Sequence, residues 1–202
     1  MMKPRRFTRI AAVVLPLAVV AWGDSLDEIQ KASVSINSIR ASFVQRRESD
    51  LLAAPVTARG RFYFKAPRSL RWEYVTPTRS VLIVNEGRAS RHVVKDGRWE
   101  REGAAGLQSI QFVLQEISLW VKGRFGDNPE FSPKLLPGRV ILLTPKKASM
   151  KRYVAGIELK LSNRPGVISS LTIHEGGASR TVISFADVRL NEALDERLFV
   201  EP

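Results

Sequence analysis

The chain has 202 residues, of which 44% are hydrophobic and 26% charged, a composition that suits one globular domain with a sizeable core. The absence of cysteine excludes disulfides, thiolate metal sites and a cysteine nucleophile. The formal net charge of +12 indicates an anionic partner, unless it only confers solubility.

The first 23 residues predict a signal peptide that is removed on export. Four basic residues precede an apolar stretch, Ile10–Val20, which is too short to span a membrane, and small residues follow at Ala21 and Gly23. An uncleaved anchor is the alternative. Loss of the four leader charges leaves +12 − 4 = +8 from Asp24 onward. Outside the cytoplasm the abundant polyanions are lipids, so the expected anionic partner is a membrane surface.

A helix and a strand are predicted next. Ser25 and Glu28 have the spacing of a capping box, and apolar residues follow at near-helical intervals, which predicts a helix over Leu26–Asn37. The alternation over Ile39–Glu48 predicts a strand that has on one face Ala41, Phe43 and Gln45.

The stretch from Ala58 to Thr78 predicts a hairpin of two strands around a proline-containing turn. Period-2 alternation places the charged residues on one face and a set of apolar residues on the other, namely Phe62, Phe64, Leu70, Trp72 and Tyr74. This aromatic face must either be covered by a core or be reserved for an apolar ligand.

The same hairpin resembles the signature of the LolA family, whose members carry lipoproteins through the periplasm from the inner to the outer membrane. The resemblance lies in Gly60-x-Phe62-x-Phe64-Lys65-x-Pro67, Leu70-Arg71-Trp72-x-Tyr74-x-x-Pro77, Ala41-Ser42-Phe43-x-Gln45 and Leu142-Leu143-Thr144-Pro145-Lys146. It implies an incomplete antiparallel barrel with helices that cap an apolar cavity.

The remaining pattern is mostly that of short strands. The run Val81–Val84 is apolar on both faces, and Asp96-Gly97 predicts a tight hairpin turn. Further strands are expected over 89–94, 140–144, 153–161, 167–174 and 180–189. One amphipathic helix is predicted over Leu107–Val121, which either packs on the sheet as core or covers a cavity. Residues 123–137 are expected to form a loop with short extended pieces.

These elements predict an α+β fold that is mostly β: one domain over residues 24–202, with a curled antiparallel sheet that forms an incomplete barrel, capped by two or three helices over an apolar cavity. The cavity is expected to be lined by Phe43, Phe62, Phe64, Leu70, Trp72, Tyr74, Val81, Ile83, Ile110, Leu114 and Ile117. Contacts that retain the cargo or meet its headgroup are expected from Lys65, Arg68 and Arg71.

Catalytic chemistry is not expected. His92 and His174 stand alone on separate predicted strands, and the chain has no nucleophile elbow, zinc-protease motif or phosphate-binding loop. We therefore expect no enzyme activity and no cofactor.

The expected function is that of a periplasmic carrier, a monomer that takes lipoproteins or related acyl lipids from an inner-membrane export complex to an outer-membrane acceptor. Ala66 stands where well-studied family members have arginine, and we expect their short C-terminal extension to be missing, so the cargo of a divergent paralogue is open. The alternative is a periplasmic lipid- or protein-sensing module related to regulators of anti-sigma factors.

Overall fold

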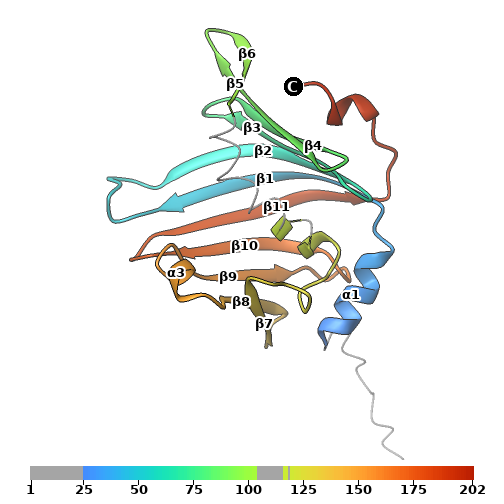
Figure 1. The fold of residues 1–202 in the computed structure, drawn as a ribbon, viewed down its shortest axis with the longest axis vertical. Coiled ribbons are helices and arrows are strands. Elements are labelled where there is room, and N and C mark those ends of the chain that lie inside the picture. The colour runs from blue at the N-terminus through green and yellow to red at the C-terminus, as the bar shows by residue number, and fades with distance from the viewer. Residues whose placement is uncertain (1–24, 104–115, 118) are drawn as a thin grey trace, which may run out of the picture.

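The computed structural model describes residues 25–103, 116–117 and 119–202 (Figure 1). Its main feature is one antiparallel sheet of 11 strands in the order β6-β5-β4-β3-β2-β1-β11-β10-β9-β8-β7. The strands are β1 (Ser38–Glu48), β2 (Val56–Lys65), β3 (Ser69–Thr76), β4 (Ser80–Asn85), β5 (Arg88–Lys95), β6 (Arg98–Arg101), β7 (Phe131–Leu136), β8 (Val140–Pro145), β9 (Val154–Leu161), β10 (Ile168–Glu175) and β11 (Arg180–Leu190). Strands β6 and β7 are its two edges, so the sheet curves without closing, which confirms the predicted incomplete barrel.

The described helices are α1 (Leu26–Val34), α3 (Ala148–Lys151) and the 3-10 helix η1 (Glu196–Phe199). The Ser25 hydroxyl accepts a hydrogen bond of 3.2 Å from the Glu28 backbone N–H, which confirms the predicted N-terminal cap of α1. Residues 116, 117 and 119–121 are also helical. They are the C-terminal end of the helix predicted over 107–121, most of which lies outside the described residues.

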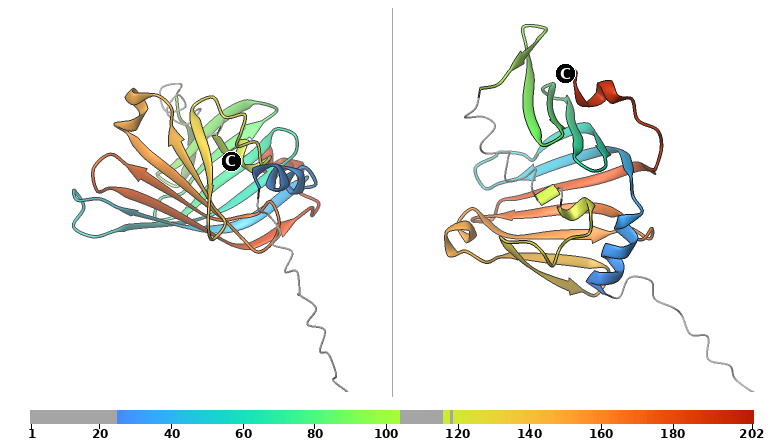
Figure 2. Two further views of the ribbon diagram at one scale, coloured as in Figure 1. Left: turned by 90° about the horizontal axis from the view of Figure 1, so that it is seen from below. Right: turned by 45° about the vertical axis from the view of Figure 1, so that its right-hand side comes forward.

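The sheet has a concave inner face, over which the segment 119–130 lies, and an outer face (Figure 2). The β2–β3 hairpin turns its predicted aromatic face inward. Phe62, Trp72 and Leu82 lie side by side across β2, β3 and β4 because directly paired residues point to the same face. The ring of Phe43 on β1 lies 4.8 Å from that of Trp72, measured between centroids. These side chains form the middle of the inner face.

The hairpin turn between β5 and β6 was also predicted correctly. Asp96 and Gly97 have φ angles of 49° and 76°, the left-handed values that a primed two-residue turn requires. Residues 123–137 contain more regular structure than expected, since β7 pairs along its length with β8.

The structure explains why glycine occupies position 60, the first position of the hairpin motif. Gly60 lies directly opposite Phe43 in the β1–β2 pairing, and a Cβ at this position would overlap both the Phe43 ring and the carbonyl oxygen of Glu73. We expect Gly60→Ala to lower the free energy of unfolding by about 1–3 kcal/mol, the usual cost of overpacking. Urea denaturation measures this. Gly97→Ala is unsuitable as a control because its φ is positive, whereas Gly126→Ala meets nothing within 4 Å and should cost much less.

Candidate apolar ligand site

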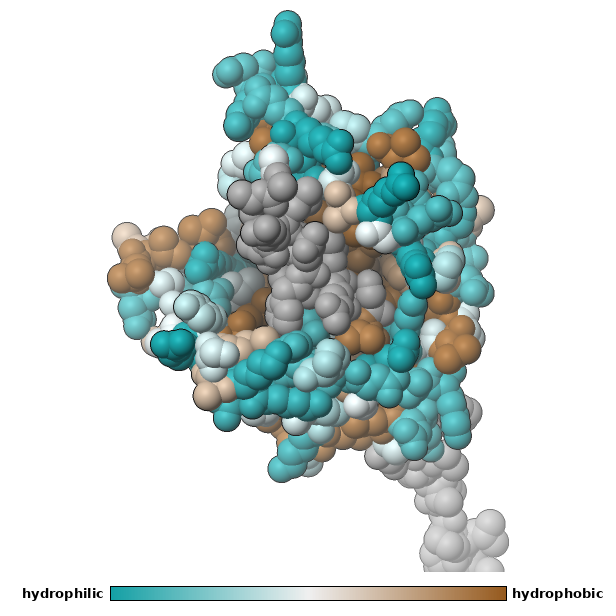
Figure 3. Space-filling view, in the orientation of Figure 1, coloured by the Kyte–Doolittle hydropathy of each residue, from teal (hydrophilic) through white to brown (hydrophobic). Residues whose placement is uncertain are grey.

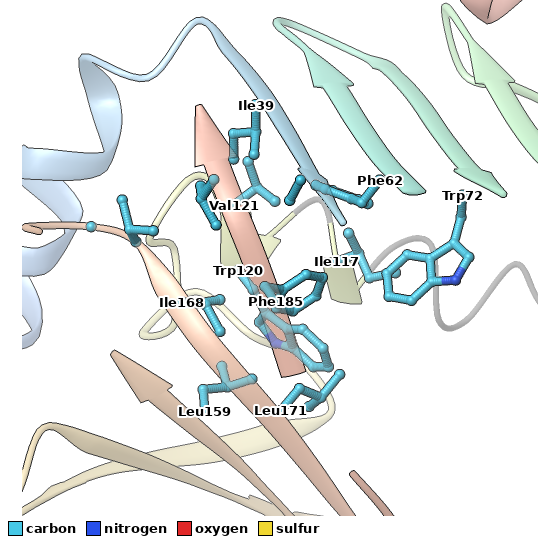
Figure 4. Close-up of a pocket in the computed structure, with 14 residues that line it drawn as sticks. Ile39, Phe62, Trp72, Ile117, Trp120, Val121, Leu159, Ile168, Leu171 and Phe185 are labelled. Atoms are coloured by element: carbon cyan, nitrogen blue, oxygen red, sulfur yellow. The ribbon is translucent and has the colours of Figure 1, made fainter. Parts of the chain in front are cut away.

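The inner face holds two adjoining pockets. The smaller, which we call the α1-side pocket, has a cavity volume of about 60 Å³ (Figure 4) and is lined by Ile39, Ala41, Phe62, Trp72, Ile117, Trp120, Val121, Leu159, Gly166, Val167, Ile168, Leu171, Phe185 and Val188. The larger, the hairpin-side pocket, has a volume of about 370 Å³ and is lined by Gln45, Trp72, Tyr74, Ser80, Leu82, Arg91, Glu116, Ile117, Trp120, Val154, Ile157, Leu171, Ile173, Thr181 and Ile183. Its volume lies within the range of about 300–1,000 Å³ that is usual for ligand pockets.

Four residues line both pockets: Trp72 from β3, Leu171 from β10, and Ile117 and Trp120 from the helical segment that comprises residues 116–117 and 119–121. In Figure 4 the indole of Trp120 lies beside Phe185 and above Leu171, while Ile117 lies beside Trp72. The helical segment therefore covers the middle of the concave face, where the two pockets meet.

Three polar side chains of the hairpin-side pocket have partners within the protein. The Tyr74 hydroxyl donates a hydrogen bond of 2.8 Å to Gln45 Oε1, and burial raises the pKa of this tyrosine. Arg91 forms an ion pair of 3.1 Å with Glu102. The Thr181 hydroxyl donates to Glu175 Oε1 over 2.8 Å. Among the described residues, the indole N–H groups of Trp72 and Trp120 are buried without an acceptor. Most of the other lining residues are apolar, so the pocket offers a ligand chiefly apolar contact.

Glu116 is the buried carboxyl of this site. Asn128 Nδ2 donates a hydrogen bond of 2.7 Å to Glu116 Oε2, and Asn128 Oδ1 accepts bonds of 2.9 Å from the backbone N–H groups of Glu130 and Phe131. The pair thereby ties the helical segment to the start of β7. Burial is the largest cause that raises the pKa of Glu116 above its ordinary value of 4.5.

This shift makes the stabilisation by Glu116 depend on pH. A carboxyl whose pKa is raised by folding stabilises the fold fully below its unfolded pKa and loses that contribution as the pH rises through its folded pKa. Glu116→Gln keeps an acceptor for Asn128 without the charge. We therefore expect the free energy of unfolding of Glu116→Gln, minus that of the unsubstituted chain, to become more favourable to the variant from pH 4 to pH 7. Urea denaturation at both pH values measures this difference. An offset that is the same at both pH values would contradict this.

The predicted cavity residues fall into four groups. Trp72 and Ile117 line both pockets, Phe62 lines the α1-side pocket and Tyr74 the hairpin-side pocket. Others are buried in the apolar core of the inner face without lining either pocket: Phe43, Phe64 and Leu70. Ile110 and Leu114 lie outside the described residues.

Val81 and Ile83 form the fourth group and correct the sequence-based expectation. They pair directly with Glu73 and Arg71, so they point to the outer face, and Leu82 between them lines the hairpin-side pocket instead. Helix η1 lies against β3 and β4, and Val81, Ile83 and Phe199 are all buried. A C-terminal segment covers the outer face here.

The same segment overturns the expected role of Arg71. Its side chain is buried, pairs with Glu73 over 3.2 Å, and donates to the carbonyl oxygens of Leu198 and Glu201 over 3.2 and 2.6 Å. Arg71 therefore binds the C-terminal segment to the outer face of β3 and is not placed to contact a headgroup. Lys65 forms an ion pair with Glu196, and Arg68 is exposed in the β2–β3 turn.

Several lining residues were missed from the sequence, above all Leu171, Phe185 and Trp120. The alternation within the predicted strands 167–174 and 180–189 carries a signal for the first two, because Leu171 with Ile173, and Ile183 with Phe185, repeat at period 2. Trp120 lies in the predicted helix but outside the apolar positions assigned to its stripe.

Comparison with known proteins agrees with the hairpin motif. Residues 34–91, which run from the last residue of α1 to the middle of β5, match the model of the family described as outer membrane lipoprotein carrier protein LolA. The resemblance to the LolA family is confirmed. An outer-membrane lipoprotein carrier protein of Photorhabdus laumondii subsp. laumondii is 28% identical over 112 residues, 54% of this chain and 46% of that protein. The matched part thus spans about half the length of this curated relative.

Three solved structures resemble the chain more distantly. A DUF1329 family protein from Desulfovibrio piger has a TM-score of 0.49 and 12% identity, with 86% of this chain and 96% of that one covered. A LolA superfamily protein from Nitrosomonas europaea gives 0.41 and 13%, with 87% and 97% covered. MucB of Pseudomonas aeruginosa, in a complex with MucA, gives 0.40 and 20%, with 86% and 58% covered.

Neither a membrane-spanning helix nor a cluster of metal ligands is present among the described residues. No helix among them is long and apolar enough to cross a membrane. Within the same residues no group of three or more histidine, aspartate or glutamate side chains is arranged to hold a metal ion.

Proposed function

We propose that the chain is a carrier that shields the acyl chains of lipoproteins or related lipids between the inner face of its sheet and the helical segment that contains Ile117 and Trp120. The observation that supports this most directly is the pair of adjoining apolar pockets, which share Trp72, Ile117, Trp120 and Leu171. Two apolar pockets that adjoin beneath one helical segment suit a ligand with more than one hydrocarbon chain.

The energetics favour this class of ligand. Each methylene that leaves water contributes about 0.8 kcal/mol, so even part of an acyl chain binds usefully without any charged contact. The internal pairing of Tyr74, Arg91 and Thr181 accords with this, because a ligand need not satisfy them. A carrier must also release its cargo. Apolar contacts have no required direction, so a ligand can leave them gradually, whereas a network of hydrogen bonds must be broken at fixed geometries.

The cellular setting is part of the same proposal. The N-terminal 23 residues would direct export, and residues 24–202 would act in the periplasm as one carrier domain and as a monomer. An inner-membrane export complex would supply the cargo and an outer-membrane acceptor would receive it. Lys65 and Arg68, at the β2–β3 turn, remain candidates for contact with the polar part of the cargo; Arg71 does not.

The test uses a triacylated lipopeptide, which aggregates in water without detergent. The mature chain is expected to hold it in the supernatant after ultracentrifugation, at up to one lipopeptide per chain, and to co-elute with it in gel filtration. The same peptide without acyl chains is the control and should elute alone. Failure to retain the lipopeptide, or equal retention of the unacylated peptide, would contradict the proposal.

A further inference from the structure

The turn between β1 and β2 exposes apolar side chains that the carrier proposal does not use. Leu51 is 94% exposed, Val56 48% and Leu52 39%, and the intervening Ala53, Ala54 and Pro55 are exposed as well. The turn projects beyond the sheet at the left of Figure 1 and forms the apolar patch at the left of Figure 3. It is held in shape by hydrogen bonds from the Leu52 N–H to the Ser49 carbonyl and from the Leu51 N–H to the Ser49 hydroxyl.

Two neighbouring segments lie beside this turn, at the same ends of the strands. The Ser179 hydroxyl in the β10–β11 turn donates to Ser49 over 2.9 Å, and Arg47 pairs with Glu175 over 2.7 Å. In the same β10–β11 turn, the Gly176 N–H donates a hydrogen bond to the carbonyl oxygen of Tyr153, a residue that follows α3. We call residues 46–59, 146–153 and 174–181 together the hairpin edge.

The hairpin edge is strongly basic. It contains eight cationic residues, Arg46, Arg47, Arg59, Lys146, Lys147, Lys151, Arg152 and Arg180, and three anionic ones, Glu48, Asp50 and Glu175. Its formal charge is therefore +8 − 3 = +5 with His174 neutral. The side chain of Tyr153, 72% exposed, adds an aromatic ring of the kind that is enriched at the boundary between membrane and water.

The larger pocket lies close to this edge. Its lining includes Gln45, Val154, Ile173 and Thr181, which stand at the ends of β1, β9, β10 and β11 that belong to or adjoin the hairpin edge. The α1-side pocket instead reaches Ile39, Ile168 and Val188, at the opposite ends of their strands. An acyl chain that leaves a bilayer at the hairpin edge would have a short path into the larger pocket.

We propose that the hairpin edge docks on the surface of an anionic lipid bilayer, with Leu51 and Leu52 inserted among the lipids and the surrounding cations against the headgroups. A bilayer fits these features because it accepts a narrow convex apolar tip and attracts the net positive charge of the hairpin edge. A protein partner would instead be expected to meet a broader apolar surface. Docking itself is independent of the carrier proposal, but its use in loading or unloading acyl chains rests on that proposal.

The experiment is a co-sedimentation of the mature chain with vesicles of phosphatidylcholine alone or with added phosphatidylglycerol. We expect binding to the anionic vesicles that weakens with added salt. The double substitution Leu51→Glu/Leu52→Glu, at exposed positions that the fold does not need, is expected to weaken this binding at least about tenfold, since it removes the apolar tip and adds two negative charges. Val34→Glu is the matched control, because Val34 is a 74% exposed apolar residue at the end of α1, outside the hairpin edge, and it should retain the binding.

The outcomes separate the two proposals. Absence of binding to anionic vesicles, equal binding by the double variant, or contact of the tip only with a membrane protein in crosslinking would overturn the docking proposal. Uptake of a soluble acyl probe, measured without vesicles, should be the same in the double variant as in the unsubstituted chain. Vesicle binding without probe uptake would contradict the carrier proposal and support docking. Probe uptake without vesicle binding would contradict docking and support the carrier proposal.

Discussion

Replacing Leu171 with glutamate is expected to lower the affinity for an acyl-chain probe at least tenfold. Leu171 is buried on the inner face of β10 and lines both pockets, so a carboxylate there would replace apolar contact at the point where the pockets meet. A tenfold loss corresponds to about 1.4 kcal/mol, less than two buried methylenes contribute. Titration of a fluorescent fatty-acid probe measures the change.

The adjacent residue supplies the control. Ser170 pairs with Lys160 and Ser184 and therefore points to the outer face, away from the pockets. Ser170→Glu should change the affinity by less than about threefold, the usual limit for a surface substitution. Since a buried carboxylate can also unfold the chain, Leu82→Trp provides a second test that fills the larger pocket without a charge. Equal loss of binding in Ser170→Glu, or full binding by both pocket variants, would contradict the site.

Replacing Phe43 with alanine is expected to lower the free energy of unfolding by about 3–5 kcal/mol, the usual cost of removing a buried phenylalanine ring. The ring packs over Gly60 and contacts two aromatic neighbours, with centroid distances of 4.8 Å to Trp72 and 5.3 Å to Tyr74. Its loss leaves a cavity where β1, β2 and β3 meet, which side chains fixed by the sheet cannot fill. Urea denaturation followed by tryptophan fluorescence measures the effect.

Val44→Ala is the control for this substitution, because Val44 is the next residue of β1 and pairs with Arg59 and Ser184 on the outer face. It is only partly buried, so its truncation should cost much less. If the two variants were equally stable, the central position of Phe43 in the core would be wrong.

The alternation of side chains predicted the inner face well where only one face of a strand is apolar. Phe62, Phe64, Leu70 and Trp72 alternate with charged or polar residues, so the phase of the pattern fixes which face they share. The run Val81–Val84 is apolar at every position and has no such phase. Only its pairing with β3 decides that Leu82 points inward and that Val81 and Ile83 point outward.

Arg71 shows a second limit of the pattern. Alternation placed it correctly on the outer face, and an arginine on an outer face is expected to meet solvent. It is buried because carbonyl groups 127 and 130 residues further along the chain come to lie over it. Local periodicity carries no information about such a contact.

The existence of a cavity was the part that the residues alone left open. The same apolar set can pack as a filled core or leave a space, and the difference depends on the distance between the sheet and the helical segment that contains Ile117 and Trp120. Trp120 was overlooked for the same reason, since its role follows from that placement and not from its spacing. Within the sequence, only the resemblance to the LolA family favoured a cavity over a filled core.

The most direct test of the carrier proposal is native mass spectrometry of the chain isolated from the cells that produce it naturally, followed by extraction and analysis of the bound lipid. The proposal predicts a stoichiometric adduct whose mass is that of an acylated molecule, and the identity of that molecule would separate a lipoprotein from another lipid. A clean mass without adduct, together with no uptake of an offered acyl probe, would contradict the proposal and leave the regulatory alternative.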